Sequence, residues 1–158
     1  RPIKSLKSTQ NYYNETKSFK AIDIKEFSFL YILLTKSDLI KDNFNLIENV
    51  KLFSSENKLL FEEIINQTDN FEKTNIESLK IDQSLIDRVF KYASIKHILT
   101  KNLNNDQKIL EILSELIRDL KNYELELRII ELESRFSKDW SEATFNELKE
   151  LKKLQKFN

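Results

Sequence analysis

The chain has 158 residues, of which 40% are hydrophobic and 33% charged, and its 26 basic and 26 acidic side chains give a formal net charge of zero. This balance is typical of one largely helical domain with a buried core, and it argues against a whole-domain affinity for nucleic acid or anionic membranes. The absence of glycine excludes glycine-rich phosphate loops and nucleophile elbows, and the absence of cysteine excludes disulfides and thiolate metal sites.

Residues 1–20 are predicted to be the end of a linker. Residues 1–16 are polar, show no apolar period and have Pro2 as their only landmark. We therefore expect this segment to be mobile unless it docks on the domain. It is interpreted as a basic arm without a specific role, or as a weak phosphate contact.

The first strongly apolar segment predicts a central helix. Asp23 and Glu26 have the D-x-x-E spacing of a capping box, so the helix is expected to begin near Asp23. A break at residues 35–37 then separates it from a short helix, which Ser37 or Asp38 is expected to cap. The residues predicted to face the core are Phe27, Leu30, Tyr31, Leu33 and Leu34.

Apolar spacing predicts three more helical segments before residue 102. They are expected to begin near Ser55, near Thr74 or Asn75, and at Asp82. Their predicted buried residues are Leu59, either Leu60 or Phe61, Ile64 and Ile65 in the first segment, Ile76 and Leu79 in the second, and Leu85, Ile86, Val89, Phe90, Ala93, Ile95, Ile98 and Leu99 in the last.

The longest helical pattern runs from Asp106 to about Ser137, with Asn105 as its expected N-cap. A helix of about 32 residues is about 48 Å long, several times the radius of gyration of about 13 Å for a hundred-residue domain. We therefore expect its far end to project. Its apolar residues follow a heptad seam: Ile109, Leu113, Leu116, Leu120, Tyr123, Leu127 and Ile130.

A second helix is expected to return from the end of this long helix. Asp139 and Glu142 repeat the D-x-x-E spacing, which predicts a helix start at about Trp140. The predicted fold class is all-α, with a compact bundle of five to six short helices plus a long helix and a C-terminal helical hairpin. The predicted boundaries are a bundle at residues 21–120 and a hairpin at residues 121–158, with the long helix at about 106–137 shared by both.

Apolar side chains on the predicted hairpin are the candidates for a binding site. One interpretation is that the two helices bury aromatic rings such as Trp140 and Phe157 against each other. The other is that these rings anchor a partner, because aromatic residues dominate interface hot spots. The basic run Lys149, Lys152, Lys153 and Lys156 is interpreted as the rim of such a surface or as an ordinary charged face. The candidate partner-binding residues are Phe136, Trp140, Phe145, Leu148, Leu151, Lys152, Leu154 and Phe157.

No catalytic residue, metal site or cofactor is predicted. His97 is the only histidine, and without a second histidine or a cysteine we expect it to be half-buried with satisfied hydrogen bonds. The carboxylates of the long helix lack Glu-x-x-His spacing. They are expected to pair with bases four residues on, as in Glu124 with Arg128 and Glu131 with Arg135.

Three further features bear on the setting of the protein. No apolar run reaches the roughly 18–20 residues of a membrane span, and no signal peptide is visible. The chain begins with Arg1 and contains no methionine, so we expect a fragment of a larger protein. The lack of cysteine is compatible with an intracellular setting, and we expect a cytoplasmic protein.

Two segments at the ends of the helical region match motifs of one family. Residues 25–40 read KEFSFLYILLTKSDLI and are similar to K/R-E-x-x-L-L-x-x-L-L-x-x-P-x-L-L, with Ser37 at the proline position. Residues 139–145 read DWSEATF, before Leu148 and Leu151, and are similar to D-P-S-E-x-N-F-x-x-L-x-x-L, with Trp140 and Thr144 as departures. These motifs resemble the start and the close of the C-terminal helicase-binding domain of bacterial DNA primase, alphaproteobacterial type.

The resemblance implies a non-catalytic domain that is not an enzyme by itself, because primer synthesis belongs to the zinc-binding and polymerase domains of a primase. It implies docking onto the N-terminal domain of the hexameric replicative helicase, mainly through the terminal hairpin, so that priming is coupled to unwinding in DNA replication. It also implies that a basic bundle surface receives the acidic tail of single-stranded-DNA-binding protein. Neither sequence-specific nucleic-acid binding nor a membrane is implied.

Two other classes remain open. The N-terminal helical domain of a replicative helicase, or another helical oligomerisation module, has a related arrangement and is expected to self-associate through its hairpin. An enzyme with a carboxylate site in the bundle is expected to bind metal and to lose activity when Glu111 or Glu115 is removed.

Overall fold

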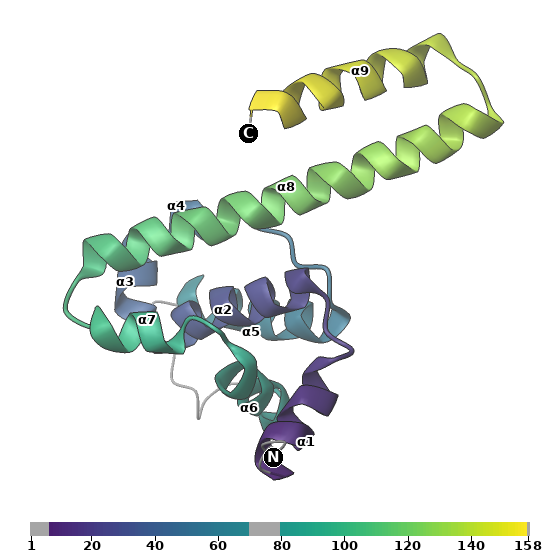
Figure 1. The fold of residues 1–158 in the computed structure, drawn as a ribbon. Coiled ribbons are helices and arrows are strands. Elements are labelled where there is room, and N and C mark those ends of the chain that lie inside the picture. Colours follow the sequence, from purple (N-terminus) through teal and green to yellow (C-terminus); the bar gives the residue numbers. More distant parts are fainter. Residues whose placement is uncertain (1–6, 70–79, 158) are drawn as a thin grey trace.

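The computed structural model describes residues 7–69 and 80–157, and over these residues the chain is all-α, as predicted (Figure 1). Helices α2 to α7 and the first half of α8 form a compact bundle, and α1 contacts α6 through the second half of its length. The second half of α8 leaves the bundle, and α9 runs back along it (Figure 1). The start expected at Thr74 or Asn75 lies outside the described residues. The helices are α1 (Lys7–Thr16), α2 (Ala21–Thr35), α3 (Ser37–Asp42), α4 (Phe44–Ile47), α5 (Ser55–Asp69), α6 (Gln83–Tyr92), α7 (Lys96–Lys101), α8 (Asp106–Lys138) and α9 (Glu142–Phe157).

Helix α2 lies at the centre of the bundle because it is apolar on nearly every side. It contacts α5, α6 and α8, so neighbours cover most of its circumference. Complete burial of each large apolar side chain contributes on the order of 1.5–3 kcal/mol. The predicted central helix is confirmed, and more of it is buried than one stripe. Its apolar side chains with at most 1% exposure are Phe27, Phe29, Leu30, Ile32 and Leu33.

The start of α2 differs from the predicted capping box. The helix begins at Ala21, so Asp23 lies in its first turn and is not its N-cap. The carboxylate of Asp23 accepts a hydrogen bond from the backbone N–H of Lys20 at 2.7 Å. Asp23 therefore stabilises the helix start from inside the helix, and Glu26 takes no part.

The carboxylate of Glu26 is instead buried between α2 and α5. Its side chain is 0% exposed and accepts hydrogen bonds from the backbone N–H groups of Phe53 and Ser54 and from Nδ2 of Asn57, the last at 2.7 Å. These donors lie at the N-terminus of α5, where the helix dipole favours an anion. Burial nevertheless raises the pKa of Glu26, because the loss of hydration outweighs these hydrogen bonds.

The segment expected to be a linker end contains α1, which docks on α6. The hydroxyl of Tyr92 donates a hydrogen bond to Glu15 at 2.5 Å, and Lys91 forms an ion pair with the same carboxylate. The ring of Tyr12 lies 5.7 Å from that of Tyr92. Because the ion pair is exposed, solvent weakens it, so the docking of α1 depends on few contacts.

The single helix that was predicted to begin at Asp82 is two helices, α6 and α7, in the structure. The predicted helix start at Asp82 is confirmed, and Asp82 is the N-cap of α6, since its carboxylate accepts a backbone hydrogen bond at 2.9 Å. The helix ends at Tyr92 because Ala93 has extended backbone angles, φ −62° and ψ 113°, and α7 begins at Lys96.

Side chains at the bundle surface also correct the predictions. Leu59 and Ile98, which were expected in the core, are 57% and 48% exposed. Each precedes a buried leucine, Leu60 or Leu99, and adjacent residues of a helix point about 100° apart, so only one of each pair reaches the core. His97 is exposed rather than half-buried.

Helix α8 is one continuous helix of 33 residues, about 50 Å long, as predicted. The side chain of Asn105 caps it, also as predicted, by accepting a hydrogen bond from the Lys108 N–H at 3.0 Å. Its first half supplies one side of the bundle core through Ile109, Leu113, Ile117 and Leu120.

We expect Glu26→Gln to remove a pH dependence of the free energy of unfolding. A raised pKa means that the native protein holds this proton more tightly than the unfolded chain does. The stabilising contribution is therefore complete below the ordinary pKa and is lost as the pH rises through the raised pKa. The unfolding free energy of the wild type minus that of Glu26→Gln, measured in urea from about pH 4 to about pH 8, should fall as the pH rises.

Glu26→Ala should destabilise the protein by about 1–3 kcal/mol, because it leaves buried donors without an acceptor. Glu62→Gln, on an exposed part of α5, is the matched control and should change neither the stability nor its pH dependence. A difference between the wild type and Glu26→Gln that does not vary with pH would contradict the raised pKa.

Candidate protein-interaction site

The hairpin formed by the second half of α8 and by α9 has a small hydrophobic core of its own. Ile129 and Leu132 of α8 meet Leu148 of α9, and these side chains are at most 9% exposed. Leu125 and Leu151 cover part of this cluster. The cluster is separate from the bundle core, so the hairpin is held together independently of the bundle.

Helix α8 presents opposite faces to these two cores. Leu120 is its last residue in the bundle core, and Ile129, nine residues later, is its first fully buried residue in the hairpin core. At 3.6 residues per turn, this separation is about two and a half turns, so the two side chains point in opposite directions. Helix α9 therefore packs on the side of α8 that faces away from the bundle, as Figure 1 shows.

The predicted heptad seam is correct in the bundle and wrong in the hairpin. Leu127 lies seven residues after Leu120, about two turns, and so stays on the bundle side of α8 after the bundle has ended. Leu127 is 41% exposed and Ile130 is 60% exposed. The hairpin core uses Ile129 and Leu132, which the seam leaves out. The helix carries two apolar stripes, and the position of α9 decides which one is buried.

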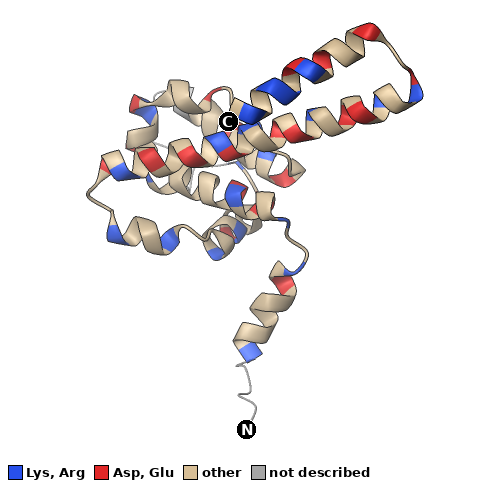
Figure 2. Cartoon of the chain, turned by 45° about the horizontal axis from the view of Figure 1, so that its top comes forward, with Lys and Arg blue, Asp and Glu red and all other residues tan. Residues whose placement is uncertain are grey.

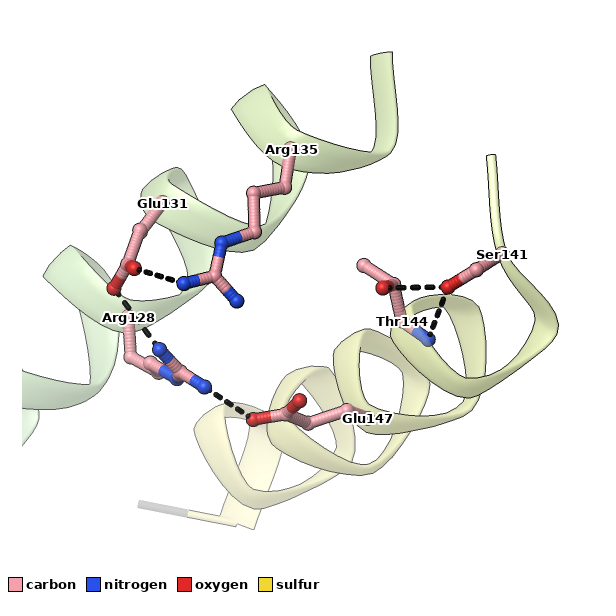
Figure 3. Close-up of polar contacts among 6 residues, drawn as sticks. All are labelled: Arg128, Glu131, Arg135, Ser141, Thr144 and Glu147. Carbon is pink, nitrogen blue, oxygen red and sulfur yellow. Dashed lines mark hydrogen bonds and ion pairs between the residues drawn. The ribbon is translucent and has the colours of Figure 1, made fainter. Parts of the chain in front are cut away.

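An arginine at the side of the hairpin joins its two helices. Arg128 of α8 contacts Glu131 of the same helix at 3.0 Å and Glu147 of α9 at 2.8 Å (Figure 3). Hydrogen bonds to Glu147 and then to Glu131 raise the pKa of Arg128. The predicted pair of Glu131 with Arg135 is confirmed at 3.0 Å. These contacts help to set the register of α9 on α8.

The predicted pair of Glu124 with Arg128 is wrong. Glu124 instead forms an ion pair with Lys51 at 2.5 Å, from the loop before α5. Sequence spacing finds pairs within one helix, and here the nearest base to Glu124 comes from a distant part of the chain.

The turn at the tip of the hairpin also differs from the prediction. Helix α9 begins at Glu142, and the hydroxyl of Ser141 accepts a hydrogen bond from the Thr144 N–H at 3.1 Å (Figure 3). Ser141 is therefore the capping side chain. Asp139 still belongs to the end of α8, because its N–H donates to the carbonyl of Arg135 at 2.8 Å.

Three aromatic rings meet at this tip and form what we call the aromatic cluster. The centroid of the Phe136 ring lies 5.9 Å from the centroids of both the Trp140 and the Phe145 rings. Trp140 is nevertheless 76% exposed and Phe145 is 47% exposed. Neighbouring rings hold one another in place while much of their area stays open to solvent, which is the property of an interface anchor.

The other candidate residues lie in different surroundings. Leu148 and Leu151 belong to the hairpin core or cover it, so they hold the hairpin together. Leu154 and Phe157 are 56% and 89% exposed. Lys152 borders an open hollow of about 390 Å³ on α9, which we call the lysine groove and which is lined by Phe145, Leu148, Lys149, Lys152, Lys153 and Lys156.

Within residues 7–69 and 80–157, histidine and carboxylate side chains do not gather in groups of three or more that would suit a metal ion. Over the same residues, each helix is too short or too polar to cross a membrane.

Comparisons with protein-family models, with curated proteins and with solved structures give no match to this chain.

We expect Leu132→Ala to release α9 from α8 while the bundle stays folded. Leu132 is 0% exposed, and loss of a buried leucine side chain costs about 2–5 kcal/mol, which is a large effect for so small a core. In hydrogen exchange, the amides of α9 should lose protection and those of α2 should keep it. Ile130→Ala, at a 60% exposed position of the same helix, is the control and should leave the amide protection of both α9 and α2 unchanged. Loss of protection in α2 as well would show that the two cores unfold as one unit.

Proposed function

We propose that this chain is the non-catalytic domain of a bacterial DNA primase that docks onto the N-terminal domain of the hexameric replicative helicase. The observation that carries the proposal is the exposed aromatic cluster of Phe136, Trp140 and Phe145 at the end of a projecting arm. Docking through such an arm would couple primer synthesis by the rest of the primase to unwinding by the helicase.

The order of the helices supports this proposal. The resemblance to primase implies a bundle of short helices, then a long helix and a terminal hairpin, and α2 to α9 follow that order. The two family-like motifs fall in α2 and at the turn between α8 and α9. One motif therefore belongs to the centre of the bundle, and the other builds the tip of the arm.

The arm suits docking for a physical reason. Its helices are joined by a separate core and by the bridge from Arg128 to Glu147, so the hairpin is ordered before a partner binds. A preorganised surface loses less conformational entropy on binding than a flexible one. The exposed area of Trp140 is then available as a hot spot, which is typically worth 2 kcal/mol or more, about thirtyfold in affinity.

We expect Trp140→Ala and Phe145→Ala each to weaken binding of the cognate helicase N-terminal region by about tenfold or more. Titration calorimetry with the full chain measures this loss, and circular dichroism checks that the hairpin is still helical. Tyr13→Ala is the matched control, because Tyr13 is an aromatic residue of α1 with 66% exposure and lies far from the tip in sequence. Undiminished affinity in both tip variants would contradict docking through the aromatic cluster.

A second candidate function is that of a helical oligomerisation module, as in the N-terminal domain of a replicative helicase. It is favoured by the exposed apolar stripe of Leu127 and Ile130 on the bundle side of α8. If this stripe joins copies of the chain, light scattering should give a mass that rises with concentration to that of a dimer or hexamer. Ile130→Ser should restore the monomer. A monomeric mass for the wild type at every concentration would exclude this candidate.

A further inference from the structure

The lysine groove on α9 combines an apolar floor with a basic rim. Phe145 and Leu148 supply the floor, and the volume of the hollow, about 390 Å³, lies within the range of pockets that take ligands or side chains. Figure 2 shows the basic residues gathered towards the C-terminal half of α9. The rim consists of Lys149, Lys152, Lys153 and Lys156.

Part of this rim is already neutralised within the chain. Lys152 pairs across the hairpin with Glu133 at 2.7 Å, and Lys153 pairs with Glu150 of its own helix at 3.3 Å. These pairs fix two of the rim lysines on the sides of the groove.

The other two rim lysines are open to a partner. Lys149 and Lys156 form no ion pair with the described residues, and both are exposed. They lie seven residues apart, about two turns, and so stand on one side of α9 about 10.5 Å from each other along its axis. The floor lies beside Lys149 on the tip side of both lysines, and it includes Phe145, which is also a member of the aromatic cluster.

We infer that the lysine groove binds an acidic amphipathic helix of a partner protein, laid along α9. Carboxylates at seven-residue spacing on that helix would face Lys149 and Lys156. Apolar residues of that helix beyond the carboxylate that faces Lys149, towards the tip, would fill the floor, as in other helix-in-groove complexes. Both the charge and the apolar floor are needed, because exposed ion pairs alone contribute at most about 1 kcal/mol each.

The surroundings of the rim favour a peptide over a nucleic acid. The carboxylates of Glu133 and Glu150 lie directly beside it and would repel a strand that carries one phosphate for each nucleotide. The formal net charge of the chain is zero, so the chain as a whole offers a nucleic acid no net electrostatic attraction. An acidic helix can place its few carboxylates opposite the two unpaired lysines and keep them away from Glu133 and Glu150.

This inference deepens the proposed function and rests on it for the identity of the natural partner. Because Phe145 belongs both to the aromatic cluster and to the groove, one continuous surface runs from the tip along α9. The helicase N-terminal domain is then expected to present an acidic amphipathic helix to this surface.

The test uses a labelled synthetic helical peptide with leucines at every third and fourth position and glutamates on both sides of that stripe. In fluorescence anisotropy it should bind the full chain, more weakly as salt is added, and it should shift the NMR signals of the groove residues. Lys149→Glu combined with Lys156→Glu should weaken binding by about tenfold or more. Replacement of both lysines by arginine should preserve it. Lys101→Glu combined with Lys121→Glu, at exposed positions of α7 and α8, is the matched charge control and should have little effect.

Several results would overturn the inference. One is equal affinity for a peptide in which lysines replace the glutamates, because the binding would then not depend on charge. Another is complete displacement of the peptide by a single-stranded oligonucleotide. NMR shifts confined to other helices, or self-association in which α8 of a second copy occupies the groove, would have the same consequence.

The double charge reversal of Lys149→Glu with Lys156→Glu, tested for binding to the helicase N-terminal region, separates this inference from the proposed function. If the helicase binds and the reversal weakens it, both are supported. If the helicase binds equally well after the reversal, the proposed function stands and the groove inference fails. If only the acidic peptide binds, the groove inference stands and the helicase is not the partner.

Discussion

The packing of α8 between two separate cores on opposite faces is the constraint on which the rest of the molecule depends. Between Leu120 and Ile129 the buried side of the helix turns by about half a revolution, so α9 must lie away from the bundle. If the buried stripe of α8 had continued through Leu127, α9 would have packed on the same side of α8 as the bundle. The exposed aromatic cluster and the lysine groove follow from this change of face.

The direction of the arm is set where α8 leaves the bundle. The ring of Tyr123 packs edge-on against Phe53, with centroids 4.8 Å apart, and Lys25 pairs with Asp119 at 2.8 Å. Phe53 is itself held by the buried Glu26, which accepts a hydrogen bond from its backbone N–H. A carboxylate at the centre of the bundle is therefore connected through one aromatic residue to the base of the arm. Burial of a charge costs stability, and here it positions the loop that supports α8.

Two surfaces of different chemistry lie on the same arm. The aromatic cluster offers exposed rings held by one another, which suits an anchor that is buried in a partner's pocket. The lysine groove adds directional charge beside an apolar floor, which suits recognition of one orientation and one sign of charge. Because the two share Phe145, a partner helix that fits the groove would bring its end to Trp140. Affinity would then come mainly from the rings and specificity mainly from the lysines.

The local sequence was enough to predict the all-α class, the continuous length of α8, the helix start at Asp82 and the cap at Asn105, because helical hydrogen bonds and caps join residues a few positions apart. The length of α8 also predicted that it projects. Only the tertiary structure decided which apolar stripe of its second half is buried, since Leu127 and Leu132 are equally apolar and the choice depends on where α9 packs. The partners of Glu26 were hidden for the same reason, because they lie just before α5 and in its first turn, which folding brings to Glu26. The sequence alone showed which residue types the candidate site on the hairpin contains. Their division into a core, an exposed cluster and a groove required the contact between two helices.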